Sequence, residues 1–332
     1  MRTSLVSEQG FSTVNTRPIA RRPALLAAML VALSAAASGC NDPAASTGEA
    51  EAARGQARGG RLTIVMIPKA TQATFWNQVR RGPEQAAAEF DVELIWKGPA
   101  KDNDRTEQQR VLQQFTNESV AGILLAPTDR VGLAEDVRTA TRKGIPVLIF
   151  DSGLDGQQGE DFISYVATDN LAAGRLGGKH LMELVGAGGK TILFRHMEGQ
   201  ESTTNRETGA LEEFGAGEAE VLSSNRYSGE TSIQAQTTAL NMIDLIRQAA
   251  GIFASNQTAS EGMLLALEQQ NLAGKVKFVG FDSSPLLVRG LREGSIDALV
   301  VQDPVQMGYT AVAQMVKHLR GEAVEPLVRT ET

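Results

Sequence analysis

Short apolar runs alternate with longer amphipathic stretches along most of the chain, beginning near Leu62. Short runs that are apolar throughout are typical of parallel strands buried on both faces, and the stretches between them have helical spacing and length. The predicted strands are residues 62–67, 91–96, 120–126, 145–151, 163–167, 190–195, 220–224, 251–254, 275–281 and 296–302. The predicted helices are residues 75–90, 104–117, 131–143, 170–185, 203–214, 231–247, 259–270, 285–293 and 305–320.

Regular alternation of strands and helices predicts an α/β fold, with parallel sheets covered by helices on both faces and right-handed crossovers. The strands fit two sheets of five or six better than one large sheet, because two domains of ordinary size account for the length. We therefore predict two doubly wound, Rossmann-like lobes. One position conflicts with this pattern. Gly82-Pro83 falls inside the first predicted helix, where proline removes a hydrogen bond and is expected to kink or restart the helix.

Two of the predicted strands end in the same way. One reads I-P-V-L-I-F-D-S and ends at Asp151, and the other reads V-K-F-V-G-F-D-S-S-P and ends at Asp282. A carboxylate at the carboxyl end of a buried parallel strand faces the crevice where α/β proteins bind ligands. The repetition therefore predicts two similar halves facing one cleft. The alternative is that each aspartate caps the helix that follows it.

Composition narrows the classes of function. The chain has 332 residues and a formal net charge of -7, and residues 1–60 contain six Arg and four acidic residues. The remainder carries 26 basic and 35 acidic side chains, without a cluster of Lys and Arg. Binding to nucleic acid requires clustered cations, so we expect no nucleic-acid partner. The three histidines lack metal-ligand spacing and no G-x-S-x-G motif occurs, so we expect no metal, no cofactor and no catalysis.

The N-terminal segment has the charge order of an export signal. Arg17, Arg21 and Arg22 precede an uncharged run over residues 24–39, which is shorter than the roughly 20 residues that a membrane span needs. The pair Arg21-Arg22 also permits a twin-arginine signal. We predict that residues 1–40 are removed or processed during export.

Cys40 follows this run directly and is the only cysteine, so no disulfide can form within one chain. Ala37-Ser38-Gly39-Cys40 resembles the lipobox of bacterial lipoproteins, which implies a lipid at Cys40 and anchoring of the protein to a membrane. The alternative is an ordinary cleavage site with an incidental cysteine, and hence a soluble periplasmic protein. Residues 41–60 are small and polar and predict a flexible tether, with the folded body beginning near Arg61.

Several short motifs now have a structural context. They are A-P-T-D (126–129), F-D-S (150–152), A-T-D-N (167–170), S-T-T-N-R-E-T-G (202–209), F-A-S-N (253–256), G-F-D-S-S-P (280–285) and V-V-Q-D-P-V-Q-M-G-Y (300–309). In this order and spacing the chain, from Leu62 to about Glu325, resembles the periplasmic sugar-binding proteins of the ribose/galactose type (periplasmic binding protein-like I), which share their fold with the LacI-type repressors.

The resemblance implies two lobes that exchange strands and close on a sugar, which is then passed to an ABC-type permease in the inner membrane. It places the crossings of a three-segment hinge near Thr168, Gln302 and Glu322. The implied lobes are residues 61–168 with 303–321, and residues 169–302 with 322–332. A monomer on the periplasmic side of the cell envelope is expected.

Pocket positions follow from the resemblance, one motif at a time. Aromatic faces suit the apolar side of a sugar ring, although Phe75 and Trp76 could instead only pack the start of their helix. The implied ligand-binding residues are Phe75, Trp76, Asp151, Ser152, Thr204, Asn205, Tyr227, Asn256, Asp282 and Gln302.

The sequence also departs from the ribose-binding members. Ser152 and Thr204 stand where those members have Arg, and Ala73 and Ala126 where they have Asn, while Arg206 is expected to fix its own loop. Ribose in its usual pose would leave hydroxyls unpaired, which predicts a different ligand. Two pocket carboxylates without a matching Arg also disfavour an anionic ligand.

Three other classes of protein stay open at this point. An enzyme is the main rival, and turnover of a substrate would reveal it. A transcriptional repressor would share the fold, but it needs a helix-turn-helix domain where residues 1–60 carry the export signal. A periplasmic sensor for a signalling receptor would have the same pocket as a transport receptor.

Overall fold

A computed structural model describes residues 60–332, so the predicted signal, the lipobox cysteine Cys40 and the tether up to residue 59 lie outside the described part. Six strands form a parallel sheet in the order β11-β5-β4-β3-β1-β2. We call this sheet and its helices the first lobe. Its strands are β1 (Thr63–Ile67), β2 (Glu93–Trp96), β3 (Gly122–Leu125), β4 (Val147–Phe150), β5 (Tyr165–Thr168) and β11 (Leu327–Thr330).

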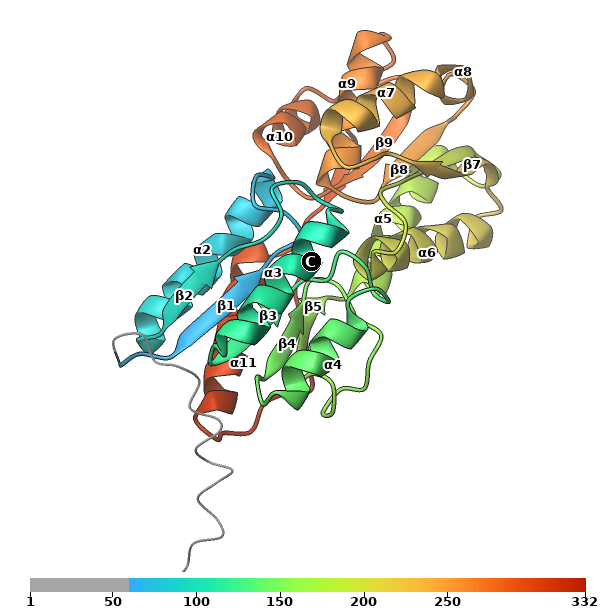
Figure 1. The fold of residues 1–332 in the computed structure, drawn as a ribbon. Helices are drawn as coiled ribbons and strands as arrows, with labels where there is room; N and C mark the ends of the chain where they lie inside the picture. The colour runs from blue at the N-terminus through green and yellow to red at the C-terminus, as the bar shows by residue number, and fades with distance from the viewer. Residues whose placement is uncertain (1–59) are drawn as a thin grey trace, which may run out of the picture. The chain divides into compact units, whose positions relative to one another are not determined.

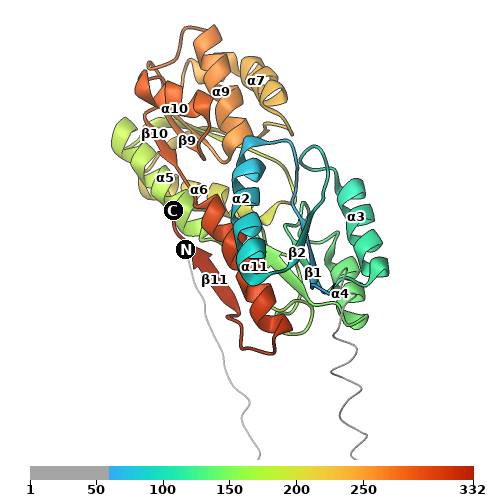
Figure 2. The same cartoon turned by 90° about the vertical axis from the view of Figure 1, so that its left-hand side faces the viewer.

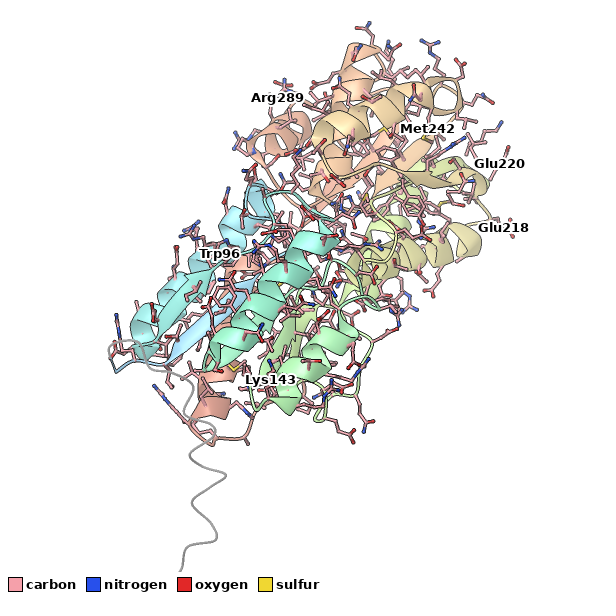
Figure 3. All side chains as sticks on the ribbon, viewed as in Figure 1. Trp96, Lys143, Glu218, Glu220, Met242 and Arg289 are labelled. Atoms are coloured by element: carbon pink, nitrogen blue, oxygen red, sulfur yellow. The ribbon has the colours of Figure 1, made fainter. Side chains whose placement is uncertain are left out.

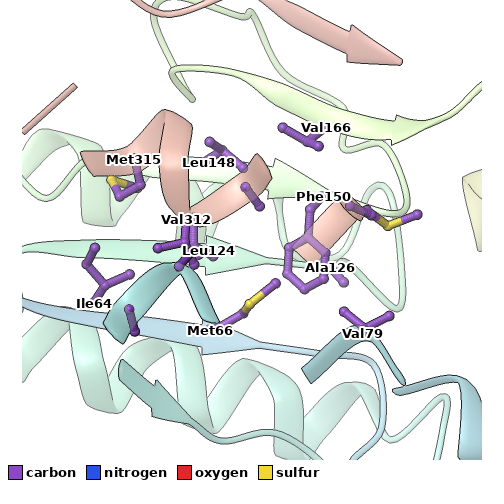
Figure 4. Close-up of a cluster of buried hydrophobic side chains, with 14 of the residues drawn as sticks. Ile64, Met66, Val79, Leu124, Ala126, Leu148, Phe150, Val166, Val312 and Met315 are labelled. Atoms are coloured by element: carbon purple, nitrogen blue, oxygen red, sulfur yellow. The ribbon is translucent and has the colours of Figure 1, made fainter. Parts of the chain in front are cut away.

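Side chains alternate between the two faces of this sheet. Ile64 and Met66 of β1 pack with α2 (Thr74–Phe90) and α11 (Pro304–Leu319), which lie side by side in Figure 2. The cluster on this face is drawn in Figure 4. The intervening residues Val65 and Ile67 pack on the other face, against α3 (Arg105–Glu118) and α4 (Ala134–Arg142). Successive side chains of β1 therefore point to opposite faces of the sheet, and both faces are buried under helices.

The second lobe repeats this arrangement around a five-stranded parallel sheet of order β10-β9-β8-β6-β7 (Figure 1). Its strands are β6 (Lys190–Arg195), β7 (Glu220–Tyr227), β8 (Gly251–Ala254), β9 (Lys277–Phe281) and β10 (Ala298–Val300). Leu193, Phe253 and Val279 pack with α5 (Asn170–Val185) and α6 (Glu201–Ala216). Ile192, Ile252 and Phe278 pack against helices on the opposite face, which are α7 (Ser232–Asn241), α8 (Ile243–Ile246), α9 (Gln257–Gln269) and α10 (Pro285–Arg292).

The prediction of two doubly wound parallel-sheet lobes is confirmed, with corrections in detail. The predicted helix over residues 231–247 is two helices, α7 and α8, with Met242 between them. Charged side chains such as Lys143, Glu220 and Arg289 point away from the ribbon, as Figure 3 shows.

The expected break at Gly82-Pro83 is wrong, because α2 continues through both residues. A Cβ atom on Gly82 would lie 1.9 Å from the backbone oxygen of Val305, and one on Gly308 would lie 2.5 Å from Cδ of Pro83. The two glycines therefore allow α2 and α11 to cross at backbone contact. Close packing against α11 explains why the sequence has Gly-Pro in a helix that does not break.

The tail of the chain also differs from the prediction. Residues 322–332 were expected in the second lobe, but Leu327–Thr330 form β11, which pairs in parallel with β5 of the first lobe. The strand gives β5 a hydrogen-bonded neighbour on its second edge, and Val328 packs against the core. Oγ1 of Thr168 donates to Oε1 of Gln302 at 2.9 Å and lies 3.4 Å from Oγ1 of Thr330. The chain therefore stays in the first lobe through Thr330 and does not cross to the second lobe at Glu322.

Candidate binding site

Residues from both lobes line one cavity, which encloses about 420 Å³ of space, part of it open to solvent. The loops that follow the carboxyl ends of the strands supply most of its wall. Six of the ten predicted residues line it: Phe75, Trp76, Asp151, Asn256, Asp282 and Gln302. The sequence interpretation missed or assigned differently Lys69, Asp102, Gln200, Ser202, Thr203, Arg206, Gln257 and Thr258, and it treated Ala73 as a lost contact.

The two aspartates occupy equivalent positions in the two lobes. Asp151 follows β4 with φ 63°, and Asp282 follows β9 with φ 67°, so both have left-handed backbones. Both side chains are buried. Aspartate tolerates this conformation better than most residues, and such backbones concentrate at functional sites. The alternative of helix capping is wrong for Asp282, because Ser284 caps α10 by accepting from the backbone N–H of Leu287.

Two hydrogen bonds hold Asp282. Its Oδ1 accepts from Nε2 of Gln302 at 2.7 Å, and its Oδ2 accepts from the backbone N–H of Gln257 at 3.1 Å, at the N-terminus of α9. Burial raises the pKa of Asp282 above its ordinary value of 3.8, against the opposing effects of Arg206 and Gln302, and the charge of Asp151 raises it further. The site therefore holds this carboxylate at an energetic cost.

Lys69 is the most consequential residue that the sequence interpretation missed. Its Nζ lies 2.9 Å from Oδ2 of Asp151, and both side chains are almost fully buried. The ammonium also donates to Oε1 of Gln200 at 3.2 Å and to Oγ of Ser202 at 3.0 Å. Lys69 lies two residues past β1, at the same edge of the sheet as Asp151. A cation that follows a buried strand at this edge was the signal that could have identified it.

Arg206 was expected to fix its own loop, but it lies within α6, bonds to other segments of the second lobe and also lines the cavity. Its Nε donates to Oδ1 of Asn170 at 2.8 Å and its Nη1 to the backbone oxygen of Ser255 at 3.2 Å. The guanidinium lies 3.9 Å from the ring centre of Phe281. It is close enough to Asp282 to oppose the rise in the pKa of that carboxyl.

These cations correct the predicted charge of the pocket. Two aspartates without a matching cation were expected, but Lys69 pairs with Asp151 and Arg206 interacts with Asp282. The argument from like charge against an anionic ligand therefore loses its basis.

Four predicted residues, all within the described range 60–332, are not among those that line the cavity: Ser152, Thr204, Asn205 and Tyr227. Oγ of Ser152 accepts from the backbone N–H of Ser202, and the ring of Tyr227 stacks with Arg195. Helix α6 begins at Glu201, two residues before its predicted start. Ser202 and Thr203 line the cavity in place of Thr204 and Asn205.

Phe75 and Trp76 both line the cavity and also pack at the start of their helix. Trp76 lines the cavity but is buried in the core, with its ring edge-on to Phe150 at 6.2 Å and to Phe75 at 5.2 Å. Phe75 is only half-buried, and its backbone N–H donates to Oε1 of Gln257 in the second lobe at 2.8 Å. Phe75 is thus the aromatic face that is freer to contact a ligand.

Asp102 and His196 form a second polar pair, with Oδ2 of Asp102 3.6 Å from Nε2 of His196. Burial would raise the pKa of Asp102, but the nearby His196 and Lys69 hold that pKa below its ordinary value. Residues 60–332 contain no group of three or more His, Cys, Asp or Glu side chains placed to hold a metal ion. Over the same residues, no helix is long and apolar enough to cross a membrane.

Comparison with known families identifies the class of protein. A family model described as "Periplasmic binding protein domain" matches residues 64–323. The chain therefore belongs to the periplasmic binding protein family, and the resemblance inferred from the sequence motifs is confirmed.

Individual relatives and solved structures agree with this assignment. The D-allose-binding periplasmic protein of Escherichia coli is 27% identical over 267 residues, covering 79% of this chain and 86% of the relative. An ABC transporter solute-binding protein from Agrobacterium vitis, solved with bound D-fucose, has a TM-score of 0.78 and 30% identity over 81% of this chain and 93% of that one. A carbohydrate transporter solute-binding protein from Agrobacterium radiobacter, in complex with D-arabinose, has a TM-score of 0.77 and 28% identity, covering 82% and 92%.

Proposed function

We propose that this protein is the solute-binding component of an ABC-type sugar importer, which binds a monosaccharide or a similar polyhydroxy compound between its lobes. The observation that carries the proposal is the pair Asp151 and Asp282, buried at equivalent strand ends and lining one cavity. A carboxylate can accept hydrogen bonds from two neighbouring hydroxyls, and charge-assisted bonds of this kind contribute about 1.5–3 kcal/mol each. Phe75 supplies an apolar face beside them.

The charges of the cavity favour a neutral ligand. Lys69 and Arg206 offset Asp151 and Asp282, so the wall presents donors and acceptors in near balance. Asn256 and Gln302 can both donate and accept, which suits hydroxyl groups. A compound with several hydroxyls and no net charge uses such a wall without leaving an ion unpaired.

A thermal-shift screen tests this function, with D-allose, D-ribose, D-fucose and D-arabinose as the first probes, followed by other pentoses, hexoses and polyols. A sugar at 100 times its dissociation constant adds about 2.7 kcal/mol to the free energy of unfolding. Asp282→Asn is expected to abolish the shift, whereas Asp244→Asn, on the exposed surface of α8, is expected to preserve it. If no compound of the panel shifts the melting temperature and the protein turns over a substrate, the enzyme interpretation would replace the proposed function.

The periplasmic location of the family is consistent with an export signal over residues 1–40. We further propose that Cys40 carries a lipid that anchors a monomeric receptor to the membrane, so that residues 41–60 tether the folded body near an inner-membrane permease. Labelled palmitate is expected to be incorporated by the wild type and not by Cys40→Ala. Incorporation by both would remove the lipobox interpretation without affecting the sugar-binding assignment.

A further inference from the structure

Residues 198–202, which lead from β6 into α6 of the second lobe, make a dense set of contacts with the first lobe. We call this segment the strap. Its backbone oxygens at Glu198 and Gly199 accept from Nη2 of Arg105 at 2.9 Å and from the backbone N–H of Arg130 at 3.1 Å. Its backbone N–H at Ser202 donates to Oγ of Ser152 at 3.0 Å. These three bonds fix the backbone of the strap against the first lobe.

Gly199 lets the strap approach this closely. Its φ is +87°, in the region that favours glycine. A Cβ atom there would lie 3.0 Å from both Nη2 of Arg105 and Oδ2 of Asp129, which are themselves joined through the ion pair of Arg105 with Asp129. The backbone geometry therefore favours glycine here, and a Cβ atom would also require Arg105 or Asp129 to shift slightly.

The side chain of Glu201 joins the strap to two groups of the first lobe. Its Oε2 accepts from the backbone N–H of Gly153 at 2.9 Å and from the hydroxyl of Tyr165 at 3.0 Å, both in the first lobe. Burial and the charge of Glu201 raise the pKa of Tyr165 well above its ordinary value of 10.0, so the hydroxyl stays protonated and remains a donor. Glu201 is not among the described residues that line the cavity. It therefore joins the lobes without contacting the binding site.

Lys69 connects the strap to the cavity. The same ammonium that pairs with Asp151 donates to Gln200 and Ser202 of the strap, and Nε2 of Gln200 donates to Oδ1 of Asp102 at 3.0 Å. Across the cavity the lobes share the bond between Phe75 and Gln257. Direct bonds between the lobes outside the hinge are thus concentrated on the strap.

We propose that the strap sets the equilibrium between open and closed lobes, and that Glu201 is a positioning residue for ligand binding. A receptor whose closed state is only partly populated binds with an affinity reduced by that fraction. The bonds of Glu201 join protein to protein, so they favour closure by the same factor whichever ligand is bound. This role goes beyond the proposed function, and only its ligand-binding test depends on that function.

The distance between the lobes tests the proposal without a ligand. Spin labels at Arg81→Cys and Ile233→Cys, both exposed and one on each lobe, report closure in full-length protein that carries Cys40→Ser. Glu201→Ala is expected to shift the distance distribution toward the open state, and Tyr165→Phe to shift it less, because it removes only one of the two bonds. The matched control is Glu135→Ala, which removes a glutamate in the first turn of α4 that pairs only with Arg138 and Arg142 of its own helix.

Calorimetry with D-allose and D-ribose supplies the second readout. Glu201→Ala is expected to weaken binding of both sugars about tenfold and by the same factor, while Glu201→Gln, which keeps one acceptor oxygen, partly restores affinity. A distance distribution unchanged from that of Glu135→Ala, or a loss that differs between the sugars, would overturn the proposal. If the wild type binds no sugar of the screened panel, the proposed function fails, and the distance measurement still decides the role of the strap.

Discussion

The ammonium of Lys69 lies 2.9 Å from the carboxylate of Asp151, and only 3% and 4% of the two side chains are exposed. A buried ion pair contributes less net stability than its electrostatic attraction alone would give, because both ions have lost their hydration. Removing one partner, however, leaves the other buried without compensation. The pair is therefore a point where stability and ligand binding depend on the same two residues.

Lys69→Met is expected to lower the free energy of unfolding by about 3–5 kcal/mol, because it leaves Asp151 as an unpaired buried charge. Adding Asp151→Asn should recover part of that loss while ligand binding stays absent. Urea denaturation of the two single variants and the double variant measures the coupling between the residues. Lys143→Met, at an exposed lysine, serves as the control for loss of a positive charge. Additive effects of Lys69→Met and Asp151→Asn would show that the two groups do not interact.

Asp282→Asn is expected to raise the free energy of unfolding at neutral pH while it abolishes ligand binding. Because the pKa of Asp282 is raised in the folded protein, its ionised form is less stable there than in the unfolded chain. That cost is fully present above the raised pKa and is lost as the pH falls below the ordinary value of 3.8. The gain from Asp282→Asn should therefore shrink on acidification. Denaturation curves from neutral pH to pH 3 measure it, and a gain that grows as the pH falls would contradict the assignment.

The two aromatic residues should separate core packing from ligand contact. Trp76→Ala is expected to cost about 3–5 kcal/mol of stability, because the ring is buried against Phe150. Phe75→Ala should cost much less stability, and it should weaken sugar binding by up to about tenfold through loss of a stacking face. Thermal unfolding and calorimetry on both variants measure the two effects. Equal stability losses would show that Phe75 belongs to the core as fully as Trp76 does.

Most of the fold could be predicted because every strand except β11 carries its own signal. Residues 190–195, for example, have an apolar centre at residues 192–194, and the structure places β6 at residues 190–195. The equivalence of Asp151 and Asp282 was also present in the local pattern, since each directly follows an apolar strand. Signals of this kind depend only on neighbours in sequence.

The remainder of the site depends on partners far apart in sequence. Lys69 is separated from Gln200 by 131 residues, and nothing beside Lys69 indicates that pairing. Helix α6 shows the second difficulty, because the family resemblance placed Thr204 and Asn205 at the cavity, whereas Ser202 and Thr203 line it. The tail shows a third, since β11 is stabilised by pairing with β5 rather than by its own polar sequence.

The final prediction concerns the crossing of α2 and α11. Two Gly→Ala substitutions, one at the crossing and one away from it, separate the effect of helix packing on stability from that of helix propensity. Gly82→Ala would place a Cβ atom 1.9 Å from the backbone oxygen of Val305, and backbone cannot move aside as a flexible side chain can. We expect a loss of about 1–3 kcal/mol or more, despite the higher helix propensity of alanine. At Gly215 of α6, apart from its chain neighbours and its own helix backbone, no described atom lies within 4 Å of a new Cβ, so Gly215→Ala should be neutral or stabilising by up to about 1 kcal/mol. Urea denaturation of the two variants tests the contrast, and equal effects would show that the helices separate without cost.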